Sequence, residues 1–116
     1  MSNSDMSIPL KPVVLHILLA LRDQDRHGYG AMQAVREQSG GRIHLQTGSF
    51  YRHLGRLIEL GLVAERPAPH PGADPRRGAH YTITAPGRRL LEQQRQYLSE
   101  VLATLQVEPQ RRKGTA

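Results

Sequence analysis

The segment from residue 67 to residue 78, PAPHPGADPRRG, restricts the fold more than any other stretch of the chain. It contains four prolines and two glycines, and proline lacks the backbone N–H that helices and central strands need. The segment is therefore predicted to be a loop. Short runs typical of β-strands flank it: Leu62–Arg66 precedes it, and Tyr81 and Ile83 alternate with polar residues in the run 79–84 that follows. Two strands joined by such a loop predict an antiparallel hairpin.

Three helices are predicted before this hairpin. The first is expected from residue 9 or 11 to residue 22, with Pro12 in its first turn. Its apolar residues recur at helical spacing: Val13, Val14, Ile17, Leu18 and Leu21. A shorter second helix is expected within residues 29–41, where two glycines end it. The third helix is expected at about residues 47–60, so a three-helix core precedes the hairpin.

A long helix is predicted after the hairpin, at residues 86–107, with Thr84 as its N-cap. Its apolar residues form a stripe at three- and four-residue steps, which Gln94 interrupts: Leu90, Leu91, Tyr97, Leu98, Val101, Leu102 and Leu105. This stripe can pack on its own domain or on a second copy of the chain. Because the preceding helices already supply a core, we expect a homodimer, with the first helix joining the interface.

The order of three helices, strand, loop, strand and long helix is typical of a winged helix-turn-helix protein, a mainly α fold with a small β-hairpin. We expect this domain at residues 10–85, with the wing at about 62–84. A flexible tail at residues 1–9 precedes it, and the C-terminal dimerisation helix follows at residues 86–107. Residues 108–116 are expected to form a basic flexible tail.

The third helix has two distinct faces when its residues are placed at about 100° intervals. One face gathers apolar residues and the other polar ones: Phe50, Leu54, Leu57 and Ile58 against Ser49, Arg52 and Arg56. A helix-turn-helix protein places the start of its recognition helix in the major groove, where arginine can donate two hydrogen bonds to guanine. These residue types therefore suit DNA recognition. A solvated arginine face, with Thr47 as an ordinary N-cap, is the alternative that the sequence leaves open.

The charge of the chain favours an anionic partner. It has 16 Lys+Arg against 10 Asp+Glu, a net charge of +6 and a pI near 10.5. Nearly all of the basic residues are arginine, the side chain that best suits phosphate and base edges, although a G+C-rich genome produces the same bias. Arg76 and Arg77 lie at the far end of the loop, where a wing would touch the DNA backbone or the minor groove.

Other classes of protein find no support in the sequence. The chain has no cysteine and no apolar run near the roughly 20 residues that span a bilayer, and its N-terminus lacks the order of a signal peptide. The histidines are scattered without metal-ligand spacing, and no acid, base and nucleophile cluster together. We therefore expect a cytoplasmic protein that is not an enzyme and has no metal, cofactor or membrane partner. His16, in an apolar helix, is expected to be a satisfied buried side chain.

Several ordered motifs resemble the PadR family of bacterial transcriptional regulators over residues 11–92. Members typically show His-Gly-Tyr before the second helix, Gly-Thr-Leu-Tyr opening the third, Glu-Gly-Leu-Val entering the wing and Tyr-x-Leu-Thr-x-x-Gly leaving it. This chain has His27-Gly28-Tyr29, Gly48-Ser49-Phe50-Tyr51, Leu60-Gly61-Leu62-Val63, and Tyr81-Thr82-Ile83-Thr84 with Gly87. It departs from the pattern at Thr47, Ser49, Phe50 and Arg52. Because these positions lie at the DNA-facing end, the operator sequence cannot be carried over.

The resemblance implies a dimeric winged-helix repressor that binds double-stranded DNA and is relieved by an effector. A symmetric dimer reads a pseudo-palindromic operator. By motif matching, four residues lie near phosphates or base edges, namely Tyr29, Thr47, Ser49 and Tyr51; Arg52 and Arg56 join them on geometric grounds. Some relatives bind planar drugs or phenolic acids between the dimer halves, but Tyr97 is the only aromatic residue of the stripe, which disfavours a stacking pocket. A winged-helix adaptor for another protein and a basic RNA-binding protein are the alternatives.

Overall fold

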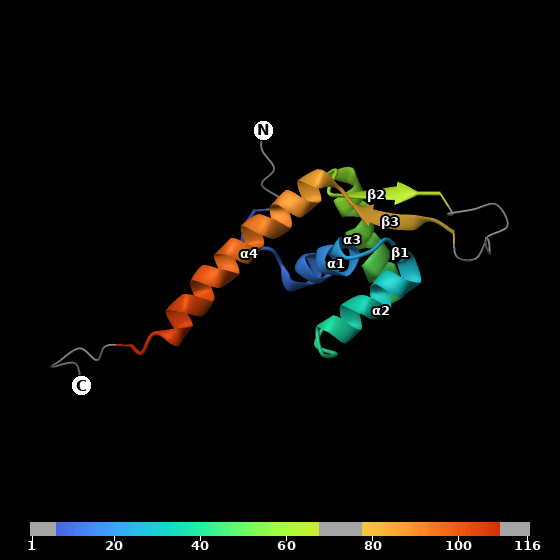
Figure 1. The fold of residues 1–116 in the computed structure, drawn as a ribbon. Helices are drawn as coiled ribbons and strands as arrows, with labels where there is room; N and C mark the ends of the chain where they lie inside the picture. The colour runs from blue at the N-terminus through green and yellow to red at the C-terminus, as the bar shows by residue number, and fades with distance from the viewer. Residues whose placement is uncertain (1–6, 68–77, 110–116) are drawn as a thin grey trace.

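The computed structural model describes residues 7–67 and 78–109 of the chain. Within these residues, four helices and a three-stranded sheet follow one another (Figure 1). Their order is α1 Pro12–Arg22, β1 Arg26–His27, α2 Gly28–Gln38, α3 Thr47–Glu59, β2 Val63–Arg66, β3 His80–Ile83 and α4 Ala85–Gln106. The predicted winged helix-turn-helix fold is confirmed, and all four predicted helices and both predicted strands are present.

The core forms around α1, which the other elements surround. Pro12 suits the first turn of α1 because the N–H that it lacks has no partner there. The apolar residues of α1 cover more than one stripe, and Ile17, Leu18 and Leu21 are at most 1% exposed. Buried residues from the other three helices and from β2 and β3 join them: Ala31, Val35, Phe50, Leu54, Leu57, Val63, Ile83 and Leu91. This shared core fixes which face of α3 points outward.

The sheet contains a strand, β1, that the sequence did not predict. The strand order is β1-β3-β2, with all pairs antiparallel, and Arg26 pairs with Tyr81 while His27 pairs with His80. The rings of His27 and His80 meet edge to face, with centroids 4.1 Å apart. Because β1 has only two residues, it is too short to show the alternation that reveals a strand. It ties the start of α2 to the wing strand β3.

The long helix α4 continues directly from the sheet. The predicted N-cap is confirmed, since Thr84 Oγ1 accepts a hydrogen bond from Gly87 N at 3.1 Å and donates one to Gly61 O at 2.7 Å. Beyond Gln94 no residue of α4 is buried, and this part of the helix extends away from the domain (Figure 1). Despite this length, neither α4 nor another described helix combines the length and apolar character that crossing a membrane requires.

Two side chains differ from what the sequence indicates. Gln94 interrupts the apolar stripe of α4, yet it is only 2% exposed, because its Oε1 accepts a hydrogen bond from Leu10 N at 2.9 Å. His16 is half-buried rather than buried. Gln38 Nε2 donates to the His16 carbonyl oxygen at 2.6 Å and lies 3.2 Å from its Nδ1, and burial lowers the pKa of the imidazole.

Candidate nucleic-acid interface

α3 is anchored by one face and leaves the other open. The residues that anchor it are at most 1% exposed, as predicted: Phe50, Leu54 and Leu57. Ile58, expected among them, is half-buried. On the opposite side Arg52 and Arg56 are exposed, and Ser49 lies half-buried at the border between the two faces. The structure therefore brings the two arginines together on an outward surface, with Ser49 at its edge.

The two arginines have different surroundings. Arg56 Nη1 lies 3.1 Å from Glu59 Oε1, and both side chains remain largely exposed. An exposed pair of this kind contributes little to stability, so the pair with Glu59 does not prevent Arg56 from contacting another anion. Arg52 has no hydrogen-bond or ion-pair partner among the residues that the structure describes. Its guanidinium group is available to an external anion.

The start of α3 carries no side-chain cap. Gln46 occupies the N-cap position in an extended conformation without a capping hydrogen bond. Thr47 is the first helical residue and is exposed, so the ordinary N-cap role considered for Thr47 is excluded. The first N–H groups of a helix have no intrahelical partner, and the helix dipole favours negative charge near them. This end of α3 can therefore receive an anion.

Lys11 adds positive charge beside Arg52, and both cations lie near His53. Burial lowers the pKa of His53, and the charges of Arg52 and Lys11 lower it further. Since such effects require short separations, the residue before α1 and the middle of α3 belong to one cationic cluster. Sequence reasoning missed Lys11 and His53, because only the packing of α1 near α3 brings them together.

Tyr51 lies over the first residue of α2. Its ring meets Phe50 edge to face, with centroids 5.3 Å apart, and its side chain is 42% exposed. A Cβ atom on Gly28 would collide with the Tyr51 hydroxyl and lie 2.7 Å from Cζ, so this ring requires glycine at that position. Burial raises the pKa of Tyr81, and electrostatic interactions with Glu65 and Tyr51 raise it further. Tyr51 therefore connects α3 to both α2 and the sheet.

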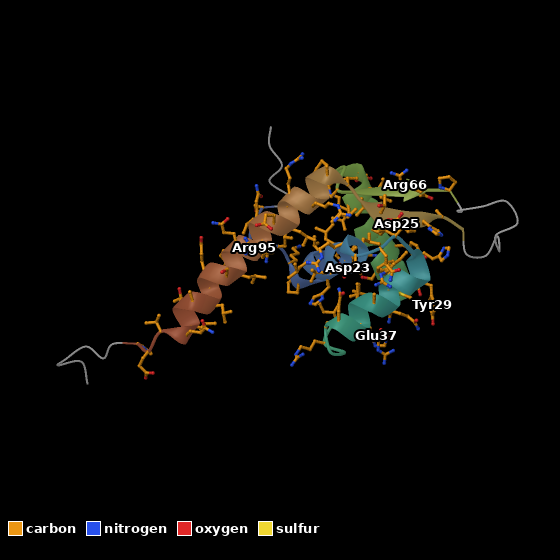
Figure 2. The ribbon with its side chains drawn as sticks, viewed as in Figure 1. Asp23, Asp25, Tyr29, Glu37, Arg66 and Arg95 are labelled. Carbon is orange, nitrogen blue, oxygen red and sulfur yellow. The ribbon has the colours of Figure 1, made fainter. Side chains whose placement is uncertain are left out.

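Tyr29 stands beside this contact at the start of α2 and is 65% exposed (Figure 2). Its hydroxyl accepts a hydrogen bond from Gln33 Nε2 at 3.0 Å. His27, the N-cap residue of α2, makes no side-chain cap. The structure thus places exposed tyrosines near the starts of two helices, α2 and α3, whose first N–H groups no side-chain cap occupies.

The wing is described only in part. Arg66, the last residue of β2, is exposed and is the cross-strand neighbour of His80 (Figure 2). Arg76 and Arg77, which the sequence singled out as wing contacts, lie outside the described residues.

The predicted dimerisation stripe of α4 divides into two parts. Leu91 is buried and Leu90 half-buried, and both pack on the core of their own chain. The remaining residues lie farther along the helix and are exposed or, for Val101, half-buried: Tyr97, Leu98, Val101, Leu102 and Leu105. A cleft of about 260 Å³ between α1 and α4 adds Leu15 and Leu19 to this apolar surface, together with Arg22, Arg88 and Arg95. Most of the stripe therefore has no apolar partner among residues 7–67 and 78–109 of its own chain.

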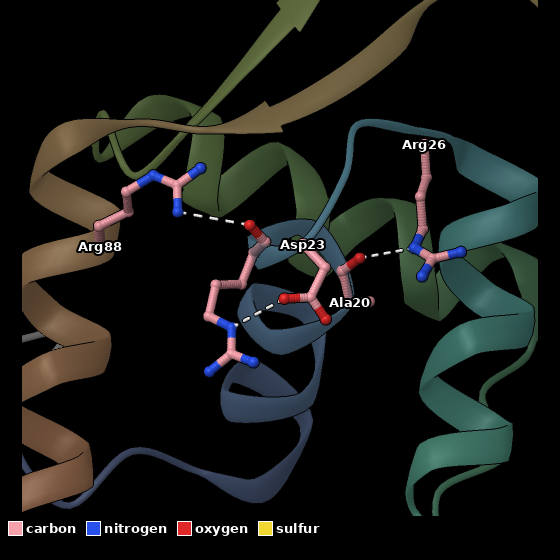
Figure 3. A network of polar contacts seen from close by, with 5 residues as sticks. Ala20, Asp23, Arg26 and Arg88 are labelled. Carbon is pink, nitrogen blue, oxygen red and sulfur yellow. Dashed lines mark hydrogen bonds and ion pairs between the residues drawn. The ribbon is translucent and has the colours of Figure 1, made fainter.

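Two arginines that the sequence did not single out hold the end of α1 (Figure 3). Arg26 Nε donates to the Ala20 carbonyl oxygen at 2.6 Å, and Arg88 Nη1 donates to the Arg22 carbonyl oxygen at 3.3 Å. The last carbonyl groups of a helix have no intrahelical partner, so these donors satisfy them. They come from β1 and α4, and no spacing in the sequence could have indicated the contact.

Solved structures of transcription regulators share this fold. A PadR family transcription regulator from hypervirulent Clostridium difficile is 22% identical with a TM-score of 0.66, over 82% of this chain and 98% of its own. Bordetella bronchiseptica BpsR, whose DNA binding is regulated by 6-hydroxynicotinic acid, is 23% identical with a TM-score of 0.65, over 88% of this chain and 66% of BpsR. Bacillus subtilis PadR, solved in complex with operator DNA, is 21% identical with a TM-score of 0.59, over 90% of this chain and 55% of that one.

The sequence itself identifies the family more directly than these structures, whose low identities show the fold alone. No curated protein matches the chain significantly. The family model of the transcriptional regulator PadR-like family matches residues 15–93, from α1 into α4 and well over half of the chain. The chain therefore belongs to the PadR-like family, whose members are transcriptional regulators and not enzymes.

Proposed function

We propose that this regulator is a homodimeric repressor that binds a pseudo-palindromic DNA operator through α3 and is relieved by an effector. The observation that carries the proposal is the outward face of α3, where Arg52 and Arg56 are exposed above buried apolar anchors. Arg52 has no partner among the described residues, and the pair that Arg56 makes with Glu59 is exposed and weak. Both guanidinium groups are exposed and can therefore contact bases or phosphates.

The residues around this face divide into two roles. Arg52 and Arg56 are proposed to reach base edges in the major groove, since arginine is the commonest specific reader of guanine. The other contacts are proposed to position the protein on the phosphate backbone, through the helix starts and the wing: Tyr29, Thr47, Ser49, Tyr51, Arg76 and Arg77. Support comes from the uncapped start of α3 and from the exposure of Tyr29 and Tyr51.

The apolar half of α4 supports the dimer. Tyr97, Leu98, Leu102 and Leu105 are between 37% and 76% exposed in one chain. Burying one such leucine contributes roughly 1.5–3 kcal/mol, so a second copy that covers all of them gains substantial free energy. We propose that the second copy packs along α4 and α1. A symmetric dimer then presents two α3 helices about 34 Å apart, one turn of DNA.

The effector is proposed to bind in the cleft between α1 and α4. The cleft between α1 and α4 is apolar and carries three arginines, and BpsR shows that a regulator of similar fold responds to a small aromatic acid. A ligand that enters between the domain and the dimer helix changes the separation of the two recognition helices. Such a change relieves repression, because only one separation matches the operator.

Selection of bound fragments from random double-stranded DNA tests the proposal. The expected product is a palindrome whose half-sites lie about one helical turn apart, and sedimentation of the free protein should give the mass of a dimer. Enrichment of single, unpaired half-sites would contradict the dimer. An absence of any enrichment would contradict sequence-specific DNA binding.

Arg56→Ala tests the role of α3 on the selected operator. Loss of a base contact is expected to weaken specific binding by roughly 1–3 kcal/mol and to relax the sequence at one position of each half-site. The matched control is Arg89→Ala, which removes the same charge from an exposed position near the start of α4. That control lies in α4, outside the recognition helix. An equal loss on scrambled DNA would show that Arg56 contacts only phosphate.

A further inference from the structure

α4 holds α1 at both of its ends. At the start, Leu10 N donates to Gln94 Oε1 at 2.9 Å, two residues before α1 begins. At the end, Arg88 Nη1 donates to the Arg22 carbonyl oxygen at 3.3 Å (Figure 3). Gln94 and Arg88 are six residues apart on α4, about 9 Å along the helix axis. Two attachments at this separation fix both the position of α4 on α1 and the direction in which it crosses.

The attachment at Gln94 is buried and specific. Gln94 is 2% exposed, Leu10 is 7% exposed, and Leu91 lies one turn before on the same face of α4. A leucine at position 94 would continue the apolar stripe, whereas a buried amide is costly unless it forms hydrogen bonds. Gln94 bonds to the N–H of Leu10 in only one register of α4 on the N-terminal segment. Any other register leaves these buried polar groups without their partner and is therefore less stable.

This attachment lies at the point where α4 leaves the domain. Gln94 is the last buried residue of α4, and Tyr97 is the first exposed residue of the apolar stripe that follows. The direction of the outer half of α4 is therefore determined by contacts at and before Gln94. The same end of α1 that receives Arg88 also receives Arg26 from β1, at the Ala20 carbonyl oxygen. α4 is thus held in a fixed relation to the sheet as well as to α1.

We propose that Gln94 and Arg88 are positioning residues that set the half-site spacing of the operator, by fixing the direction in which α4 leaves the DNA-binding domain. This inference rests on the proposed dimeric function, in which α4 joins the two domains. One added base pair moves a half-site by about 3.4 Å and rotates it by about 35° around the DNA axis. A dimer in which the direction of α4 is fixed binds the longer operator more weakly. A dimer in which α4 can change direction binds both operators.

The test compares operators whose spacer is one base pair longer or shorter than the selected one. Wild-type protein is expected to discriminate strongly between these spacers. In Gln94→Leu the discrimination is expected to fall by roughly fivefold, the scale on which one buried hydrogen bond acts, while the half-site sequence stays the same. Gln94→Met keeps the length of the side chain but supplies no acceptor oxygen for Leu10 N, and is expected to lose discrimination as Gln94→Leu does. Gln93→Leu, at an exposed neighbouring position, is the control and is expected to behave as wild type.

A second variant keeps the proposal testable if Gln94→Leu does not fold. Arg88 is exposed, so Arg88→Met leaves the core intact and is expected to reduce spacing discrimination in the same direction. Unchanged discrimination in both variants, or in Arg88→Met alone where Gln94→Leu fails to fold, would overturn the inference. A loss of affinity that is equal for all spacers would also overturn it, because a merely structural role has that effect.

A measurement without DNA separates this inference from the proposed function. The chain contains no cysteine, so spin labels can be attached at Gln33→Cys on α2 and Glu100→Cys on α4, both exposed positions. In labelled chains diluted with unlabelled protein, wild type is expected to give a narrow distance distribution, and Gln94→Leu a broader one. Equally narrow distributions refute the positioning role even if the operator is found. A broadened distribution without operator selection leaves the positioning of α4 intact and refutes the DNA proposal.

Discussion

Gly87→Ala is expected to destabilise the protein even though the glycine lies within a helix. Gly87 is buried in the first turn of α4. An added Cβ atom would collide with the Leu62 carbonyl oxygen and lie 2.7 Å from Ile83 Cγ1 and 3.3 Å from the Leu62 carbonyl carbon. The same Leu62 oxygen accepts a hydrogen bond from Thr84 N at 3.1 Å, so it cannot move away without disturbing the start of α4.

Two opposing effects decide the size of the change. Replacing glycine by alanine inside a helix stabilises by about 1 kcal/mol, through helix propensity and the entropy of the unfolded chain. Overpacking costs about 1–3 kcal/mol, and weakening the hydrogen bond from Thr84 to Leu62 costs about 1 kcal/mol more. The costs exceed the gain, because a backbone atom cannot rotate aside as a side chain can. The net loss of unfolding free energy is therefore about 1–3 kcal/mol.

Urea unfolding followed by circular dichroism at one fixed protein concentration measures this loss, since the stability of a dimer depends on concentration. The midpoint is expected to fall with an unchanged slope. Gly55→Ala, in the middle of α3, is the control because no atom lies within 4 Å of the added Cβ, and it should be neutral or stabilised by up to about 1 kcal/mol. Equal stability of the two variants would refute the close approach of α4 to Leu62.

Two further predictions concern Gly28 and the histidines. Gly28→Ala is expected to weaken operator binding more than it lowers stability, because the colliding group is the flexible end of Tyr51; a stability loss as large as that of Gly87→Ala would contradict this. Burial lowers the folded-state pKa of His16 and His53, so the unfolded chain binds protons more tightly and stability is expected to fall as the pH drops below about 6.5. The measurement is the free energy of unfolding between about pH 7.5 and 5.5. Its dependence on pH should disappear in the His16→Gln, His53→Gln double variant. An unchanged pH dependence would show that other groups cause it.

The sequence predicted those parts of the fold that local rules determine. Periodicity separated the two faces of α3, and the structure buries Phe50 and exposes Arg52 accordingly. Strand-like patterns on either side of the proline-rich segment located β2 and β3, and capping chemistry located the start of α4 at Thr84. Each of these features depends on residues within one or two helical turns of one another, so a single segment contains the whole signal.

The parts that were missed depend on contacts between distant segments. Gln94 looked like an interruption of an apolar stripe, because its partner is the backbone of Leu10, which no side-chain pattern reveals. Arg26 and Arg88 looked like ordinary surface arginines, although both bond to carbonyl groups at the end of α1. The cluster of Lys11 with Arg52 also arises from tertiary packing alone.

The capping of the helix N-termini helps to distinguish a DNA-binding face of α3 from one that is only solvated. A side-chain cap typically stabilises a helix by about 1 kcal/mol, and α4 obtains one from Thr84. The other three helices begin at Lys11, His27 and Gln46, none of which forms a side-chain cap. An uncapped start alone therefore does not mark a DNA contact, since α1 has one too. In α2 and α3 the uncapped start coincides with an exposed tyrosine, Tyr29 or Tyr51, and phosphate binds to such helix starts. A DNA-binding face recovers the free energy of these two missing caps when the operator binds, whereas a face that is only solvated does not.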